Sequence, residues 1–185
     1  VSYYSEREII RLLLKFGSVE FERLINKEDG REEILTVADY VVRELTSDEL
    51  DFSDSVCARI FAEFRFHSQQ GLITGDKVFV KHEDPAISSL AADLLADSYE
   101  LSKIWKEKQT YVETEEMKLR EIVSDAVLKF KSDKINILRK EIMLQLEEAV
   151  KNNDKERTIL LQKRYSSLSV ALGVISKQLG GRILL

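Results

Sequence analysis

Few residues in this chain have both the type and the spacing that a catalytic, cofactor-binding or metal site requires. Histidine occurs only twice. His82 is followed directly by Glu83 and Asp84, but three adjacent residues rarely converge on one metal ion. The segment 71–77 contains two glycines, yet its spacing differs from that of a phosphate-binding loop, and Asp76 would repel a phosphate. We therefore expect no catalytic, cofactor-binding or metal-ligating residue and no enzymatic activity in this chain.

The single cysteine, Cys57, lies in an apolar segment with helical spacing. One cysteine permits neither an internal disulfide nor a thiolate metal site, and an unpaired thiol is typical of a reducing, intracellular setting. No segment approaches the roughly 18 apolar residues of a membrane span. These features predict an intracellular protein without membrane contact. The sequence begins with Val1, which we interpret as a fragment or a processed product.

The composition predicts an all-α protein. Apolar residues make up 44% of the 185 residues and charged residues 33%, a combination typical of helices with one solvated face. One proline and seven glycines leave few positions at which a helix would be broken. We expect a compact helical bundle followed by a protruding antiparallel helical hairpin, the two joined by one long helix.

Local signals predict several helix ends in the first part of the chain. Ser5 begins a capping-box sequence, and Gly17 is expected to supply a left-handed helix end. A short helix is predicted at 19–25. Pro85 is expected at the first position of another helix. The segment 72–84 fits a strand, a helical turn or an extended loop, and the sequence does not decide among them.

The long helix and the hairpin occupy the last third of the chain. Apolar residues recur with helical spacing from Thr114 to Ala149 with no helix breaker, and at about 1.5 Å per residue such a helix spans about 50 Å. Because this exceeds the size of a small bundle, we expect its second half to leave the body of the domain. A turn at 152–154 would then lead into a final helix with a heptad-spaced apolar stripe: Leu161, Tyr165, Leu168, Leu172, Ile175 and Leu179. We assign residues 1–130 to the bundle and 131–185 to the hairpin.

Charge divides the chain in the same way. Residues 1–130 contain 17 Lys/Arg against 27 Asp/Glu, a formal charge of −10, and residues 131–185 contain 11 against 6, a charge of +5. A basic segment favours an acidic partner surface and faster encounter with it. Its basic residues are scattered among acids without alternating aromatics, so we do not expect direct nucleic-acid binding.

A second apolar patch on the final helix is the candidate partner-binding surface. Val170 and Val174 lie off the heptad stripe at i, i+4 spacing and could form this patch with Ile159. The basic residues around it are Lys163, Arg164 and Lys177, and the apolar surface would continue at Ile183, Leu184 and Leu185. Two plainer interpretations stay open: the valines widen the hairpin core, and the basic residues are simply solvated.

The two ends of the chain resemble a known family. The segment Glu8-Ile9-Ile10-Arg11-Leu12-Leu13-Leu14, placed just after Ser5, resembles the opening helix of the C-terminal, helicase-binding domain of bacterial DNA primase. The other end is similar as well, with a helix that contains Leu138-Arg139-Lys140-Glu141-Ile142, an acidic turn at 154–156 and a closing helix with Leu160, Tyr165 and Leu168.

The resemblance implies a non-catalytic protein-interaction domain. In this family a helical body precedes a hairpin that docks on the N-terminal collar of the hexameric replicative DNA helicase and so couples primer RNA synthesis to fork unwinding. The parent protein would be a DNA primase, a DNA-directed RNA polymerase, in the bacterial cytoplasm at the replication fork. The isolated domain is expected to be monomeric and to need no cofactor.

Two alternatives remain from the sequence. One is a collar-type domain of the replicative helicase itself, or another self-assembling helical module, which predicts a homo-oligomer. The other is a DNA-binding helical module, which predicts binding that falls steeply as the salt concentration rises.

Overall fold

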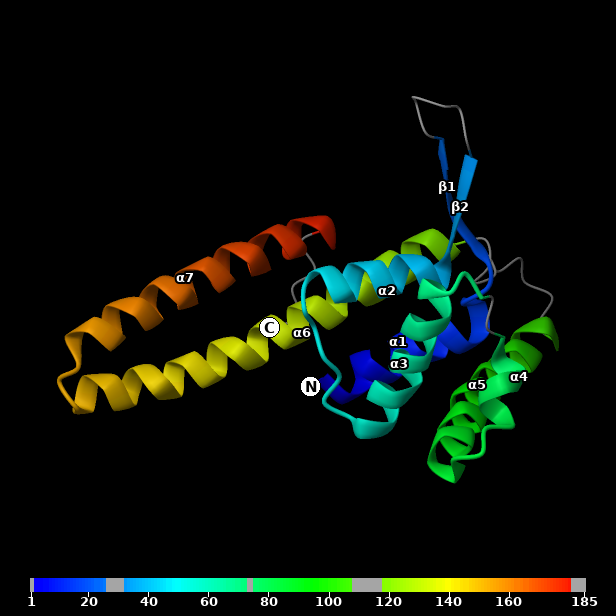
Figure 1. Cartoon of the computed structure of the whole chain (residues 1–185), viewed down its shortest axis with the longest axis horizontal. Helices are drawn as coiled ribbons and strands as arrows, with labels where there is room; N and C mark the ends of the chain where they lie inside the picture. Colours follow the sequence, from blue (N-terminus) through cyan, green and yellow to red (C-terminus); the bar gives the residue numbers. More distant parts are fainter. Residues whose placement is uncertain (1, 26–31, 73–74, 108–117, 181–185) are drawn as a thin grey trace. The chain divides into compact units, whose positions relative to one another are not determined.

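The computed structural model describes residues 2–25, 32–72, 75–107 and 118–180. Within these residues the chain forms seven helices and one two-stranded sheet (Figure 1), so the predicted all-α class is confirmed. The chain divides into two compact units, Val1–Val127 and Leu128–Leu185. The functional roles that we assigned to residues 1–130 and 131–185 stay predictions.

The first unit is built around helix α1 (Ser2–Phe16). It packs against four other helices: α2 (Val37–Ser47), α3 (Ser55–Gln69), α4 (Asp76–Val80) and α5 (Pro85–Glu107). Consecutive turns of α1 bury side chains on most of its circumference, including Ile9, Ile10, Leu12 and Leu13. A helix with so little solvated surface has to lie inside the unit.

The predicted capping role of Ser5 is wrong. Helix α1 already includes Ser2, so Ser5 lies within the helix, where its side chain is buried. Glu8, the other half of the expected capping box, instead accepts two hydrogen bonds of 2.8 Å from the guanidinium of Arg11. A local capping pattern therefore does not fix where this helix begins.

The predicted left-handed conformation of Gly17 is also wrong. Positive φ angles among the described glycines occur at Gly71 and Gly180. Gly17 is instead needed for close packing. A Cβ atom at this position would overlap the carbonyl oxygen of Leu13 and lie 3.1 Å from Cε1 of Phe64.

The helix predicted at 19–25 is wrong as well, because this segment is a β-strand. Strand β1 (Glu20–Ile25) pairs antiparallel with β2 (Glu32–Thr36), with an irregularity in register between Glu20 and Glu22. Phe21 is buried and stacks on Tyr40 of α2 at a centroid distance of 4.1 Å, while its neighbours Glu20 and Glu22 are exposed. This alternation of buried and exposed side chains suits a strand, in which successive residues point to opposite faces.

The undecided segment 72–84 contains the short helix α4. Phe79 of α4 is fully buried and stacks on Phe64 of α3 at a centroid distance of 4.7 Å. Helix α5 begins at Pro85, as predicted, and the carboxylate of Asp84 accepts a hydrogen bond of 2.8 Å from the amide of Ala86. Phe79 therefore anchors a segment that the sequence left open.

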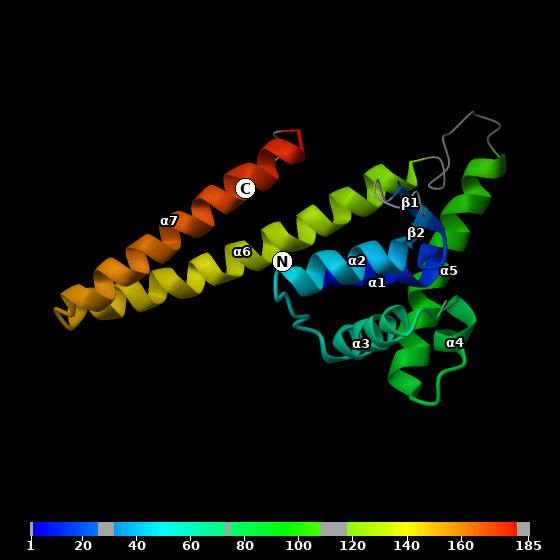
Figure 2. The same ribbon diagram turned by 45° about the horizontal axis from the view of Figure 1, so that its top comes forward.

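The second unit consists of two antiparallel helices. Helix α6 (Leu119–Lys151) begins in the first unit and continues into the second, where α7 (Lys155–Gln178) lies beside it (Figures 1 and 2). Its core contains Ile142, Ala149 and Leu161, around which Leu146, Tyr165 and Leu168 pack. The hairpin at the end of the chain is therefore present, although the predicted start of its first helix at Thr114 lies outside the described residues.

Local signals set both ends of α7. Asn153 has a φ of 55°, and the carboxylate of Asp154 caps α7 by accepting a hydrogen bond of 3.0 Å from the amide of Arg157. At the other end the helix stops at Gln178, and Gly180 has a φ of 68°. The predicted turn and the predicted glycine stop are both confirmed, because they depend on residues that tolerate positive φ.

Candidate partner-binding face of α7

Four large apolar side chains of α7 are exposed, and three of them lie close together around the helix. Ile159 is 53% exposed, Val170 67% and Val174 54%. At about 100° per residue, the three lie within about 60° of one another around the helix axis. The core-facing residues, such as Leu161 and Leu172, lie on the opposite side. The interpretation that the valines widen the hairpin core is therefore wrong. We call this surface, defined by Ile159, Val170 and Val174, the outer face of α7.

A contact between the two helices fixes which side of α7 faces outward. The guanidinium of Arg139 on α6 donates a hydrogen bond of 2.7 Å to the hydroxyl of Tyr165 on α7. Its central carbon also lies 4.8 Å from the centroid of the Tyr165 ring. This pairing combines a charge-assisted hydrogen bond with a cation–π contact. It holds Tyr165 against α6 and so keeps the outer face of α7 away from the core.

The predicted basic residues differ in their relation to this face. Lys163 and Lys177 fall on the same side of the helix as the valines, whereas Arg164 lies about 100° from Lys163. All three are exposed, and none makes an ion pair with another residue in the part of the chain that the structure describes. Two cationic side chains therefore accompany the apolar ones. Ile183 and Leu184, predicted to extend the patch, lie outside the described residues, as does Leu185.

The histidine segment that could have held a metal makes structural contacts instead. The Nδ1 atom of His82 accepts a hydrogen bond of 2.9 Å from the amide of Asp84, and Nε2 lies 3.0 Å from a carboxylate oxygen of Glu63. The imidazole therefore carries its proton on Nε2 and links α3 to the residues before α5. Asp84 pairs with Arg59. Among the described residues, no group of three His, Cys, Asp or Glu side chains is arranged to hold a metal ion.

The only thiol is buried and unreactive. Burial, together with the charge and a hydrogen bond of the nearby Asp54 carboxylate, raises the pKa of Cys57 to about 12. The thiol is consequently protonated at neutral pH, and only the thiolate is a good nucleophile. Cys57 belongs to the core of the first unit.

Sequence reasoning missed the burial of Glu6. The carboxylate of Glu6 in α1 accepts hydrogen bonds from the amides of Ser53, at 2.9 Å, and Asp54, at 2.8 Å. Glu6 is 1% exposed and therefore joins α1 to the start of α3 inside the first unit. The partners are 47 and 48 positions away, so no local pattern could have revealed them.

The sequence matches a protein-family model. The model described as "Domain of unknown function (DUF8430)" matches residues 1–183. Neither the curated proteins nor the solved structures contain a match. No helix among the described residues is both long enough and apolar enough to cross a membrane. Since the family match spans nearly the whole sequence, the chain belongs to the DUF8430 family.

Proposed function

We propose that this chain is a non-catalytic protein-interaction domain that binds the N-terminal collar of a hexameric replicative DNA helicase through the outer face of α7. The observation that carries the proposal is the exposure of Ile159, Val170 and Val174 on the side of α7 away from the hairpin core. Large apolar side chains in a row on one helix face are typical of surfaces that bind another protein.

The choice of partner rests on the resemblance to the C-terminal domain of bacterial DNA primase. That resemblance lies in the opening helix, at 8–14, and in the two helices of the hairpin. The hairpin segments contain Arg139 and Tyr165, which contact each other. In a primase, such a domain would couple primer RNA synthesis to unwinding at the replication fork in the bacterial cytoplasm.

Charge supports a protein partner with an acidic surface. Lys163 and Lys177 lie beside the apolar residues of the outer face and are exposed. Cations at the rim of an apolar patch accelerate association with an acidic surface but add little affinity at high salt. We therefore expect the association rate with helicase to fall as the salt concentration rises, and the dissociation rate to change less.

Truncation of the two valines tests the proposal. The variant Val170→Ala/Val174→Ala should weaken helicase binding by about 1–2 kcal/mol or more, roughly tenfold, because it removes central apolar contacts. Binding of the fluorescently labelled full chain to purified helicase is measured by anisotropy, with circular dichroism as a check of the fold. An unchanged affinity with intact helicity would remove the outer face of α7 from the interface.

A matched control separates a specific effect from a general loss of apolar surface. Val78 and Val80 in α4 are 50% and 40% exposed, so Val78→Ala/Val80→Ala removes the same groups elsewhere. This variant should bind helicase with the affinity of the unmodified chain. Equal losses in both double variants would contradict a docking role that is particular to α7.

The opposite charges of the two parts favour self-assembly as the second candidate function. Residues 1–130 carry a formal charge of −10 and residues 131–185 a charge of +5, so the hairpin of one copy could attract the first part of another. Size-exclusion chromatography with light scattering distinguishes the candidates. The primase-like proposal expects a monomer, and the self-assembling module expects a homo-oligomer.

A further inference from the structure

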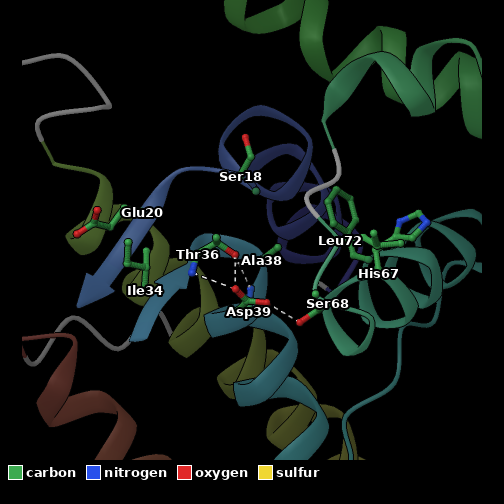
Figure 3. A pocket seen from close by; sticks show the side chains of 12 residues that line it. Ser18, Glu20, Ile34, Thr36, Ala38, Asp39, His67, Ser68 and Leu72 are labelled. Carbon is green, nitrogen blue, oxygen red and sulfur yellow. Dashed lines mark hydrogen bonds between the residues drawn. The ribbon is translucent and has the colours of Figure 1, made fainter. Parts of the chain in front are cut away.

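The first unit contains a pocket that the proposed function does not use. It has a volume of about 410 Å³ and lies where the end of α1, the two strands, the start of α2 and the end of α3 meet (Figure 3). Ligand pockets commonly have volumes of about 300–1,000 Å³. Apolar walls come from Ile34, Phe64 and Leu72, and two carboxylates, Glu20 and Asp39, also line it.

The carboxylate of Asp39 is ionised and held in place. Its Oδ1 accepts a hydrogen bond of 2.6 Å from the Ser68 hydroxyl, and its Oδ2 accepts two from Thr36, at 3.1 Å from the amide and 2.6 Å from the hydroxyl (Figure 3). Burial alone would raise the pKa of Asp39, but these hydrogen bonds outweigh it and lower the pKa below its ordinary value. A carboxylate has about four lone-pair sites, so Asp39 can accept one further donor.

The negative charge of Asp39 has no cationic neighbour in the pocket. No lysine or arginine lines it, and no ion pair involves Asp39 in the part of the chain that the structure describes. The other carboxylate, on Glu20, pairs with Arg23 at 3.2 Å, but Arg23 is shared with Glu32. The lining of the pocket therefore favours a cation.

His67 also lines the pocket, but its Nδ1 atom is buried within the protein and lacks a hydrogen-bond partner. A ligand in the pocket would therefore be anchored by Asp39 and not by this nitrogen.

We infer that this pocket binds an organic cation at the end of an apolar stem, the chemistry of a lysine or arginine side chain. Its ammonium or guanidinium group would donate to Asp39, and its methylene groups would lie against Phe64 and Leu72. Such a group can come from a partner protein or from a free alkylamine. The pocket is independent of the outer face of α7, so either site can exist without the other.

Titration of the isotope-labelled full chain with short peptides tests this inference by nuclear magnetic resonance. The probes are acetyl-Gly-Lys-Gly-amide and its arginine counterpart, with norleucine and citrulline peptides as uncharged controls of similar shape. The charged peptides should shift the amide resonances of Thr36, Asp39 and Ser68, and they should bind about tenfold more tightly than the controls, as expected for one hydrogen bond to a charged group. Equal binding of charged and uncharged peptides would overturn the inference.

Butylamine distinguishes the two sources of the cation. If it shifts the same resonances at lower concentration than the lysine peptide, the site suits a free alkylamine. If the peptide binds more tightly, the site suits a protein side chain. Both results support the assigned chemistry, whereas shifts confined to residues outside the pocket for every charged probe would overturn it.

Two variants test the residues of the site. Asp39→Asn removes the charge but keeps the size of the side chain, and it should weaken binding of the lysine peptide about tenfold. The control Asp93→Asn, on an exposed position of α5 outside the pocket, should have no effect. Asp39→Asn could also loosen the start of α2, so a second variant is needed. Leu72→Ala removes an exposed apolar wall and should weaken the binding of both charged peptides. Full binding in a folded Leu72→Ala variant, or in a folded Asp39→Asn variant, would overturn the inference.

Discussion

The two units of the molecule use their apolar residues differently. Sixteen large apolar side chains are exposed among the described residues, and eight of them lie in the second unit. That unit has fewer than half as many residues as the first. The first unit therefore buries most of its apolar surface in its own core, while the hairpin leaves a larger share exposed. A surface of this kind favours binding to another protein.

The core of the first unit also contains larger side chains than the core of the hairpin. The first unit stacks two fully buried rings, Phe64 and Phe79. The core of the hairpin contains Ile142, Leu161 and the small Ala149. Since the cost of truncating a core residue rises with the contacts it loses, one substitution should destabilise the first unit more than the second.

The largest effect is expected for Phe64→Ala. Loss of the stacked ring should lower the free energy of unfolding of the first unit by about 3–5 kcal/mol. The rate of Cys57 alkylation in increasing urea measures the opening of this unit, because the only cysteine of the sequence is buried there. The exposed neighbour Phe66 supplies the control Phe66→Ala. A comparable loss of stability in the control would contradict the difference between core and surface on which the comparison rests.

A smaller effect is expected for Leu161→Ala in the hairpin. The substitution should cost about 2–4 kcal/mol, and the amides of α7 should lose their protection from hydrogen exchange while those of α1 keep theirs. Leu160→Ala, at the adjacent exposed position, should leave the exchange rates nearly unchanged. Equal loss of protection in α1 and α7 would show that the two units unfold together.

The smallest effect is expected for Tyr165→Phe. The ring stays over the guanidinium of Arg139, but the hydrogen bond to the hydroxyl is lost, which should cost about 1–2 kcal/mol. The midpoint of urea unfolding, followed by circular dichroism, measures this loss. Tyr4→Phe, at an exposed position of α1, is the control and should not move the midpoint. A midpoint that is also unchanged in Tyr165→Phe would show that this hydrogen bond does not stabilise the hairpin.

The sequence predicted several features that depend on neighbouring residues, although the local signals at Ser5 and Gly17 were misleading. Pro85 begins a helix, and Asn153 and Gly180 supply the positive φ angles at the two ends of α7. The strand at 20–25 was missed because it depends on the contact of Phe21 with Tyr40 of another element. Apolar packing between distant segments can outweigh the helix propensity of a short charged segment.

The candidate site was predicted in outline but not in its supporting contacts. Val170 and Val174 could be identified from the sequence because they fall off the heptad stripe. The structure added the observation that both side chains are exposed. Arg139 and Tyr165 lie 26 positions apart, so their pairing can be seen only in the three-dimensional structure of the hairpin. The pocket around Asp39 and Ser68 likewise joins elements that no periodic pattern connects.

Photocrosslinking tests the central claim most directly. Replacing Val170 with benzoylphenylalanine puts a photoreactive group on the outer face of α7, and the same replacement at Val78 puts one on an exposed position of the first unit. With replicative helicase bound, irradiation should link position 170, and not position 78, to the N-terminal collar of the helicase. A complex that forms but gives crosslinks from position 78 and none from position 170 would contradict docking through α7.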